Sequence, residues 1–381
     1  MAGRKQTFQI IASGISPGDK TIWFHCASLG EFEQGVPVME SLRTTHPDHK
    51  IVVSFFSPSG YENKKKTPLA DVVVYLPIDT KSNAKKFIKK IHPSLVLFVK
   101  YEFWPNYLVE LKRQNIKTLL ISGVFREEQL FFKFYGGFMR KALDSFDQFF
   151  LQNQASKELL ASIGFTNTSV SGDTRFDRVS LSKNLNEDVD YIKEFLSEKD
   201  CLIAGSSWGG DHKMIVNYIN TSNSELKYII APHEIHREEI ETLKSSINKK
   251  TVLFSELNNE NIKTASVIIV DNIGTLSKLY KYATLAYIGG GFNGEGKLHN
   301  TLEAAVFGLP IIIGKYYSKF PEAISMIKVG GMFSVNNAES LKNKIDELIR
   351  DKEKLQKTGA LNSSFIKKKI GATQSILTNL K

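Results

Sequence analysis

Cysteine is scarce in this sequence. Among 381 residues only Cys26 and Cys201 are cysteines, and each lies in a short apolar run of the kind that forms a buried strand. Two cysteines cannot build a disulfide framework, which excludes a small disulfide-rich secreted protein. The sequence therefore favours a reducing compartment.

Long apolar runs and targeting signals are also missing. The longest candidates, such as residues 94–99, have only the length of a strand, whereas a membrane-spanning helix needs about 18 apolar residues. No charged segment followed by an apolar stretch marks a secretion signal at the N-terminus. We expect a protein that is neither secreted nor membrane-spanning. The start at residues 1–6, MAGRKQ, is unusual for a natural N-terminus, which favours either a trimmed upstream segment or a protein held at a membrane only by its surface.

Recognisable metal-binding spacing is absent as well. The sequence has no His-Glu-x-x-His motif and no cluster of cysteines and histidines. His233, His236 and His299 stand alone in expected loops, where histidine is more often a hydrogen-bonded residue than a metal ligand. We predict no metal site.

Charge, by contrast, is unbalanced. The 50 lysines and arginines against 40 acidic residues leave a formal net charge of +10. Basic proteins of this size bind nucleic acids, anionic membranes or phosphorylated ligands, although a solvated lysine-rich surface would give the same charge. Composition alone leaves these alternatives open.

Apolar strand-like runs alternate with helical segments, which is the pattern of parallel sheets covered by helices. The first half predicts strands at 21–27, 50–56, 72–76, 94–99, 117–122, 148–152 and 168–171, with helices at 33–45, 82–91, 105–114, 126–144 and 156–163. The second half predicts strands at 201–205, 227–231, 250–254, 266–270, 285–289 and 310–314, with helices at 211–220, 237–248, 276–281 and 301–307. This is an α/β fold with two doubly wound, Rossmann-like domains and a cleft between them.

Composition sets the domain boundaries. Residues 1–178 form the first domain, and polar residues without apolar periodicity mark a linker at 179–190. The second domain covers 191–352. Residues 353–381 read as a lysine-rich helical tail, for which packing back on the first domain is one option.

Ligands of doubly wound sheets bind beyond the carboxyl ends of the strands. In the first half Glu31, Glu102 and Arg175 each follow an expected strand. Glu31 suits a general base and Arg175 suits a carboxylate or phosphate ligand. The alternatives are a helix-start acid for Glu31, a lysine partner for Glu102 and an aspartate partner (Asp173 or Asp177) for Arg175.

The second half repeats this arrangement with small and polar residues. Glycines let the backbone approach a ligand closely, and helix N-termini favour phosphate. The candidate residues are Ser206, Ser207, Pro232, His233, Gly274, Thr275, Leu276, Gly290, Gly291, Asn300, Thr301, Leu302 and Glu303.

Residues 128–141 combine several aromatic residues with Lys133, Arg140 and Lys141. A buried helix would explain the aromatic residues. The alternative is an exposed apolar patch with a basic rim, which suits an anionic membrane surface and would include Phe131 and Phe132.

Seven motifs occur in order along most of the chain: WFHCASLGE at 23–31, YEFWPN at 101–106, GDTRFD at 172–177, AGSS at 204–207, APH at 231–233, GTL at 274–276, and GGG at 289–291 with HNTLE at 299–303. Together they resemble the bacterial 3-deoxy-D-manno-octulosonic acid (Kdo) transferases of lipopolysaccharide assembly.

The resemblance implies a GT-B fold and an inverting transfer from CMP-Kdo to a lipid A precursor (lipid IVA), without metal or cofactor. It implies Glu31 as the general base and Glu102 and Arg175 as support for the transition state, while the second-half candidates bind the nucleotide. It also implies work at the cytoplasmic face of the bacterial inner membrane, on an anionic surface. The number of Kdo residues added and the oligomeric state stay open.

Two rival functions remain. Another GT-B enzyme, such as a UDP-sugar transferase or a nucleotide-sugar epimerase, would share the fold. A nucleic-acid-binding protein would explain the charge, but no recognised nucleic-acid-binding module is present. We therefore predict no nucleic acid among its partners.

Overall fold

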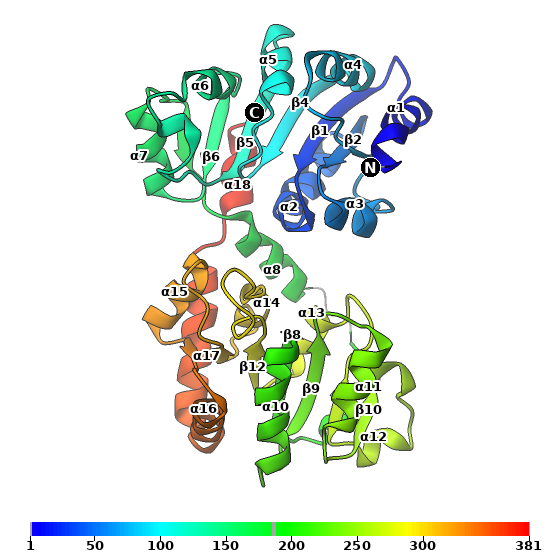
Figure 1. Ribbon diagram of the computed structural model, residues 1–381, viewed down its shortest axis with the longest axis vertical. Helices are drawn as coiled ribbons and strands as arrows, with labels where there is room; N and C mark the ends of the chain where they lie inside the picture. The colour runs from blue at the N-terminus through cyan, green and yellow to red at the C-terminus, as the bar shows by residue number, and fades with distance from the viewer. Residues whose placement is uncertain (1, 185–187, 381) are drawn as a thin grey trace. The chain divides into compact units, whose positions relative to one another are not determined.

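The computed structural model describes residues 2–184 and 188–380. The chain divides into two compact units (Figure 1). The first comprises the residues up to Arg178 together with those from Lys369 onward, and the second is Val179–Lys368.

The first unit contains a seven-stranded sheet in which every pair of neighbours is parallel, in the order β3-β2-β1-β4-β5-β6-β7. All seven strands predicted for this half of the sequence are present. They are β1 (Lys20–Cys26), β2 (His49–Phe55), β3 (Val72–Tyr75), β4 (Pro93–Val99), β5 (Lys117–Gly123), β6 (Gln148–Leu151) and β7 (Thr168–Val170).

Alternation along these strands divides the core between two faces, because successive side chains of a strand point to opposite sides. Trp23 and Phe98 belong to one buried cluster, whereas Phe24 and Leu97 belong to the other. Helices cover both clusters, and this explains why the strands have almost continuous apolar sequences.

The helices of the first unit are α1 (Ala2–Gly14), α2 (Leu29–Thr45), α3 (Pro58–Lys64), α4 (Lys81–Ile91), α5 (Pro105–Arg113), η1 (Leu130–Phe132), α6 (Gly137–Leu143), α7 (Gln154–Ser162) and α18 (Ala372–Thr378). Helix α18, red in Figure 1, packs against α2 and adds Ile376 to the core of this unit. The Asp177 carboxylate holds the N-terminus of α18 in place, since it accepts hydrogen bonds from Gly371 N, Thr373 N and Thr373 Oγ1.

The second unit contains another seven-stranded parallel sheet, in the order β10-β11-β9-β8-β12-β13-β14. Its strands are β8 (Cys201–Ser207), β9 (Lys227–Pro232), β10 (Thr251–Leu253), β11 (Val267–Ile269), β12 (Leu285–Ile288), β13 (Ile311–Ile313) and β14 (Met332–Ser334). The edge strand β14 was not predicted, because its three residues form no recognisable apolar run.

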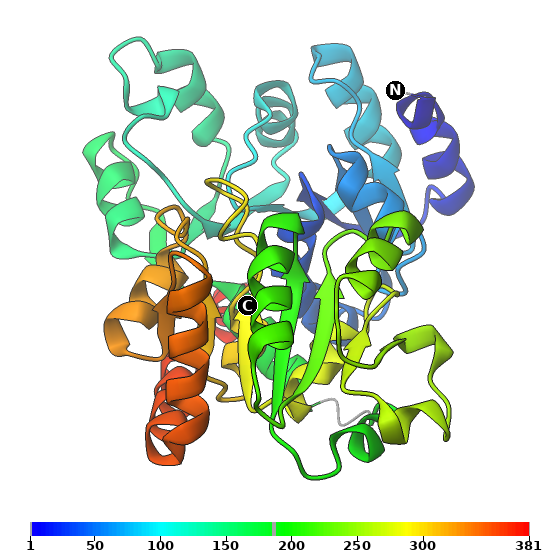
Figure 2. The same ribbon diagram turned by 60° about the horizontal axis from the view of Figure 1, so that its bottom comes forward.

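The helices of the second unit are α9 (Ile192–Leu196), α10 (Gly209–Thr221), α11 (Arg237–Ser245), η2 (Phe254–Glu256), α12 (Asn261–Thr264), α13 (Leu276–Leu279), η3 (Tyr280–Tyr282), α14 (Leu302–Ala305), α15 (Pro321–Val329), α16 (Ala338–Arg350) and α17 (Lys352–Lys367). Helix α16 packs beside α10, as the orange and green ribbons of Figure 2 show. Within the described residues, no helix has both the length and the apolar character needed to cross a bilayer.

Three expectations about helices need correction. Helix α8 (Thr174–Asn184) runs across the unit boundary and into the predicted 179–190 linker, of which residues 185–187 lie outside the described residues. Helix α2 begins four residues before the predicted 33, so Pro37 lies inside it. The helix expected at 126–144 is broken: a Cβ on Gly136 would lie 1.8 Å from the Leu130 carbonyl oxygen, and the chain turns there.

Each sheet has one point where the chain changes direction across it. In the first sheet the point lies between β1 and β4, and in the second between β8 and β12. In sheets of this kind the loops after the two neighbouring strands diverge at this point and ligands bind there, so we call the carboxyl edge at this point the crevice of each sheet.

Candidate functional site

Glu31 lies at the carboxyl end of β1, in the first turn of α2. Its Oε2 atom accepts hydrogen bonds from the backbone nitrogen of Ser28, at 2.9 Å, and from the Ser28 hydroxyl. The residue is only 6% exposed. Both contacts fall on one carboxylate oxygen, and together they form the capping box at the start of α2, so the helix-capping alternative is present.

Glu102 lies at the carboxyl end of β4, on the other side of the crevice. The indole nitrogen of Trp104 donates to Glu102 Oε2 at 2.9 Å. The Nε2 atom of the fully buried His25 is 3.5 Å from the same oxygen. The lysine partner considered from the sequence is not what fixes this carboxylate.

Tyr101 shows that the three predicted residues of the first unit share one electrostatic environment. Burial raises the pKa of its phenol, Glu31 and Glu102 raise it further, and Arg126 and Arg175 lower it. Carboxylates and guanidinium groups from separate loops therefore act on one phenol. The predicted Glu31, Glu102 and Arg175 are all among the charged groups that act on this phenol.

Sequence reasoning missed Tyr101 and Arg126 as site residues. Tyr101 is half-exposed, and Lys100 lies over its ring at 5.0 Å. Arg126 was assigned to a helix that does not form there. In the sequence, only the position of this arginine, shortly after the strand that ends at Gly123, indicated a site residue.

Arg175 is already paired. Its Nε and Nη2 atoms lie 2.8 Å from Asp173 Oδ2, and its backbone nitrogen donates to Asp173 Oδ1. The aspartate-partner alternative is thus present for Asp173, whereas Asp177 has a different role. The pairing fixes the direction of the guanidinium and does not remove its charge from the field at Tyr101.

The aromatic segment is partly core and partly surface. Phe131 is buried and contacts Phe103, the neighbour of Glu102, with ring centroids 4.8 Å apart. Phe134, Tyr135 and Phe138 are 93%, 63% and 71% exposed. The expectation that Phe131 and Phe132 form the exposed patch is wrong, because both pack against the core.

The second unit places aromatic and imidazole rings at the carboxyl edge of its sheet. Trp208 follows β8, and its ring stacks on His233, which follows β9, with centroids 4.2 Å apart. His299 lies 4.3 Å from His233 and accepts a hydrogen bond from Trp208 Nε1 at 2.9 Å. Lys297 Nζ sits 4.8 Å from the centre of the Trp208 ring.

Burial favours the neutral form of these two imidazoles. It lowers the pKa of His233, and it lowers that of His299 to about 4, with the neighbouring His233 as a second cause. His212, which contacts the hydroxyl of Ser207 at 3.0 Å, has a lowered pKa for the same main reason. The edge therefore offers flat uncharged rings and one lysine.

A fully buried carboxylate holds the crevice loops of this unit together. Asp211 accepts from Trp208 N at 2.9 Å and Gly290 N at 2.8 Å, and from Asn293 Nδ2 and the hydroxyl of Tyr287. The loops after β8 and β12 thus share one acceptor. Gly290 has φ +95°, and a Cβ there would lie 1.9 Å from Lys297 O, so only glycine fits.

The remaining candidates gather around the end of β8. A Cβ on Gly205 would lie 2.0 Å from the hydroxyl of Tyr280 and 3.2 Å from Leu276. Glu303 contributes to the raised pKa of the buried Tyr280 phenol, after burial itself. The segment 274–276 and Glu303 therefore lie near the same strand end.

The turn at 300–303 carries an unusual hydroxyl. Thr301 is 1% exposed, and its Oγ1 atom is buried without a hydrogen-bond partner among the described residues. Asn300 donates to Glu303 at 3.0 Å and accepts from Leu302 N. Helices α13 and α14, of four residues each, are shorter than predicted.

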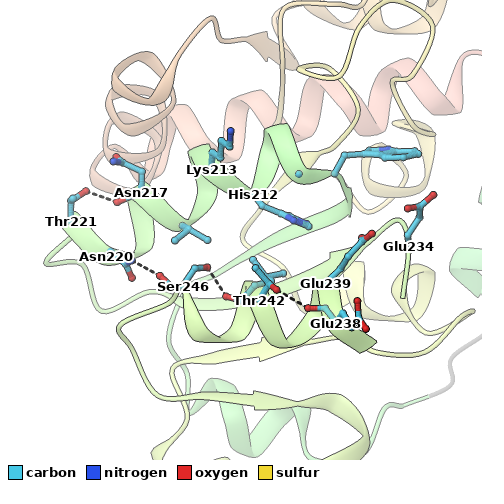
Figure 3. A pocket seen from close by; sticks show the side chains of 14 residues that line it. His212, Lys213, Asn217, Asn220, Thr221, Glu234, Glu238, Glu239, Thr242 and Ser246 are labelled. Carbon is cyan, nitrogen blue, oxygen red and sulfur yellow. Dashed lines mark hydrogen bonds between the residues drawn. The ribbon is translucent and has the colours of Figure 1, made fainter. Parts of the chain in front are cut away.

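A cavity of about 930 Å³ lies between α10 and α11 and is lined in part by Trp208 and His212 (Figure 3). His212 and Lys213 of α10 line it, as do Glu238 and Glu239 of α11. None of the ligand-binding residues predicted from the sequence lines it. Over residues 2–184 and 188–380, no three His, Cys, Asp or Glu side chains are grouped as a metal site would require.

The sequence matches known families over most of its length. Residues 3–178 match the family described as 3-deoxy-D-manno-octulosonic-acid transferase (kdotransferase), and residues 233–362 match glycosyl transferases group 1. The 3-deoxy-D-manno-octulosonic acid transferase of Haemophilus influenzae is 27% identical over 96% of this chain and 87% of its own. That of Chlamydophila psittaci is 30% identical over 77% and 69%.

A third relative is longer. The bifunctional glycosyltransferase/methyltransferase of Fusobacterium nucleatum is 27% identical over 88% of this chain, which spans only 53% of that protein. Among solved structures, UDP-GlcNAc 2-epimerase from Neisseria meningitidis has a TM-score of 0.66 at 15% identity, covering 95% and 99% of the chains. MurG from Acinetobacter baumannii has 0.56 at 12%, covering 94% and 98%. These likenesses establish the GT-B fold.

Proposed function

The chain belongs to the Kdo transferase family of glycosyltransferases, and we propose that it transfers Kdo from CMP-Kdo to a lipid A precursor, lipid IVA. The observation that carries the proposal is the grouping of Glu31, Glu102 and Arg175 around Tyr101 at the crevice of the first sheet.

Glu31 acts as the base in this reaction. It takes the proton from the acceptor's primary hydroxyl, whose oxygen forms a bond to the anomeric carbon of Kdo. The bond from that carbon to the phosphate oxygen breaks, and CMP leaves with the electron pair. Attack opposite the leaving group inverts the anomeric centre, and no metal takes part.

Glu102 and Arg175 support the transition state. The sugar gains positive charge as the CMP bond breaks, and the Glu102 carboxylate stabilises it. Arg175, held in one direction by Asp173, contributes positive charge for the donor's carboxylate. Fixed groups of this kind need no rearrangement during the reaction, which is the main source of electrostatic catalysis.

The second unit binds CMP. Trp208 and His233 offer a flat surface to the cytosine, and the glycine turn at Gly290 lets the backbone approach the phosphate. The buried, unpartnered hydroxyl of Thr301 supports a ligand in this place, because buried polar atoms are nearly always hydrogen-bonded.

Residues 130–141 place the enzyme on its lipid substrate. Phe134, Tyr135 and Phe138 are exposed, and Lys133 and Lys141 lie in the same segment. Apolar side chains with a cationic rim bind anionic membrane surfaces, such as the cytoplasmic face of the bacterial inner membrane. The contact of Phe131 with Phe103 ties this surface to the Glu102 loop.

Transfer itself is the test. The protein is incubated with tetra-acylated lipid A precursor and with CMP-Kdo made in place by its synthetase, and the lipid is analysed by mass spectrometry. A gain of one or more Kdo masses is expected and counts the additions. An unchanged lipid, with donor still forming, would contradict the proposal. Thermal stabilisation by CMP but not UDP is the second expected result, and the reverse preference would favour a UDP-sugar enzyme.

A further inference from the structure

A buried polar chain runs beneath the first-unit crevice and ends at Glu102. The indole nitrogen of Trp23 donates to Ser54 Oγ at 2.8 Å, and the same hydroxyl lies 2.8 Å from His25 Nδ1. Trp23, Ser54 and His25 are all completely buried. At the far side of the imidazole, His25 Nε2 faces Trp104 and Glu102.

The sheet register creates this chain. In the parallel pairing of β1 with β2, His25 stands directly beside Ser54, and on the other side it pairs with Phe98 of β4. The imidazole is therefore enclosed by the sheet and by aromatic rings, with Phe98 at 5.5 Å and Trp104 at 6.0 Å between centroids. Its orientation is fixed before any ligand binds.

Such a chain carries a penalty in an otherwise apolar core. Burying a polar group costs about 1–3 kcal/mol unless each hydrogen bond is made. An apolar side chain at position 25 would pack among the same rings without that requirement. The group that gains from the chain is Glu102, which ends it and whose side chain is 16% exposed, whereas that of His25 is fully buried.

The Trp104 nitrogen has one hydrogen and two acceptors. It lies 2.8 Å from His25 Nε2 and 2.9 Å from Glu102 Oε2. When Trp104 Nε1 donates its hydrogen to His25 Nε2, the imidazole carries its own proton on Nδ1 and donates it to Ser54 Oγ. When Trp104 Nε1 donates instead to Glu102 Oε2, the imidazole can carry its proton on Nε2, which faces the same carboxylate oxygen. In both arrangements the carboxylate stays against the imidazole edge.

We propose that His25 is a positioning residue for Glu102, acting with Trp104 as the shared donor. His25 does not touch the substrate in this arrangement; it holds the carboxylate that does. The inference rests on the proposed role of Glu102, and the His25–Glu102 coupling can be measured without the transfer reaction.

Kinetics provide the first arm of the test. His25→Asn should lower kcat of the otherwise unchanged enzyme by about 10–100-fold, the range typical of groups that orient a functional residue. In the Glu102→Gln background the same change should lower kcat less than about twofold, because the effects of substitutions on kcat do not add when the residues act through one another. Equal losses in the two backgrounds would overturn the proposal.

A matched variant controls for lost stability. Tyr107→Phe removes another fully buried hydrogen bond of the same core, from the Tyr107 hydroxyl to Pro77 O at 3.0 Å, next to Trp23. It should lower the unfolding midpoint in the manner of His25→Asn and leave kcat unchanged. A fall in kcat equal to that of His25→Asn would reduce His25 to a general structural role.

Imidazole NMR provides the second arm, which needs no activity. The chain has 8 histidines, and the signals lost in His25→Asn identify those of His25 in a proton–nitrogen correlation spectrum. Glu102→Gln and Trp104→Phe should each shift the Nδ1/Nε2 tautomer balance of His25, whereas Tyr107→Phe should not. Unchanged His25 signals in both variants would overturn the proposal. Shifted signals in a protein without transfer would instead place the failure in the proposed function.

Discussion

The two sheets have similar architectures, although β11 lies between β9 and β10 in the second, and their carboxyl edges carry different side chains. Each has seven parallel strands and changes direction beside its first strand. At the first crevice lie carboxyl groups, those of Glu31 and Glu102, with the Arg175 guanidinium also acting on Tyr101, whereas aromatic and imidazole rings and glycine turns line the second. The fold therefore determines where each site lies. The side chains that follow the strands determine whether the site carries charged groups for catalysis or flat rings for binding.

Buried polar groups differ in the same way. In the first unit a chain of partners leads outward to a carboxylate at the surface of the crevice. In the second unit Asp211 is itself buried and gathers the loops inward. The first arrangement presents the Glu102 carboxyl group to a ligand. The second fixes the backbone of the loops that would surround a ligand.

The largest effect should come from the first crevice. Glu31→Ala should reduce transfer by roughly 10²–10⁴-fold, the usual contribution of a general base, while leaving CMP affinity unchanged. Steady-state kinetics and CMP titration measure the two quantities. The control is Glu33→Gln, a partly exposed partner of Lys64 and Arg178 in the same helix. Retained turnover in Glu31→Ala would remove it as the base.

The converse experiment acts on the second crevice. Asp211→Ala removes a buried acceptor shared by four donors and should lower the unfolding free energy of this unit by about 3 kcal/mol. CMP affinity should fall as the loops loosen. Trp208, one of 3 tryptophans, reports urea unfolding of this unit. Tyr287→Phe, which removes one donor, should have a smaller effect, and equal effects would contradict a shared-acceptor role.

Acidification should also separate the two edges. The pKa of His299 is lowered to about 4 by burial, below the usual value of about 6.5 in an unfolded chain. Between these values the unfolded chain binds more protons, so the unfolding free energy falls as the pH drops. From about pH 7 to about pH 5 the loss should be about 2 kcal/mol.

His299→Asn is the control for this pH effect. Its side-chain oxygen can still accept from Trp208 Nε1, but it does not titrate. Urea unfolding followed through Trp208 should show a shallower fall of the unfolding free energy with acid in the variant. Identical pH dependence in the two proteins would contradict the assignment.

The smallest predicted effect concerns the exposed aromatic residues, which are a feature of the first unit. Phe134→Ser or Phe138→Ser should weaken binding to anionic vesicles by about tenfold, since a buried aromatic ring contributes roughly 1.5–3 kcal/mol and insertion is partial. Sedimentation with liposomes measures it. Ile273→Ser, at an 81% exposed position of the second unit, should change nothing. Equal losses would show that the patch has no special role.

The sheets were predictable because their strands are buried on both sides. Most strands of both sheets follow runs of Val, Ile, Leu and Phe that can be recognised without knowing their partners, whereas β7 (Thr-Ser-Val) is short and partly exposed. Helix α8 was missed because its later turns are polar. The 126–144 helix was a false prediction, because only the folded chain shows how closely Gly136 approaches Leu130.

The candidate site was predictable only in part, for a related reason. Glu31 and Glu102 are recognisable from sequence because they follow strands. His25 and Asp211 are not, since their partners are set by register and by distant loops: His25 reaches Ser54 through strand pairing, and Asp211 reaches Gly290 across the sheet. Buried polar residues acquire a role only when the fold supplies their partners.

The return of α18 to the first unit matters for anyone dividing this protein. A gene fragment ending at Arg178 would encode an incomplete core, without Ile376 and without the donors that satisfy Asp177. A self-contained version needs a short artificial link from Arg178 directly to Lys369, with the second unit excised as an insert. The second unit, being continuous in sequence, can be excised or replaced as a single cassette.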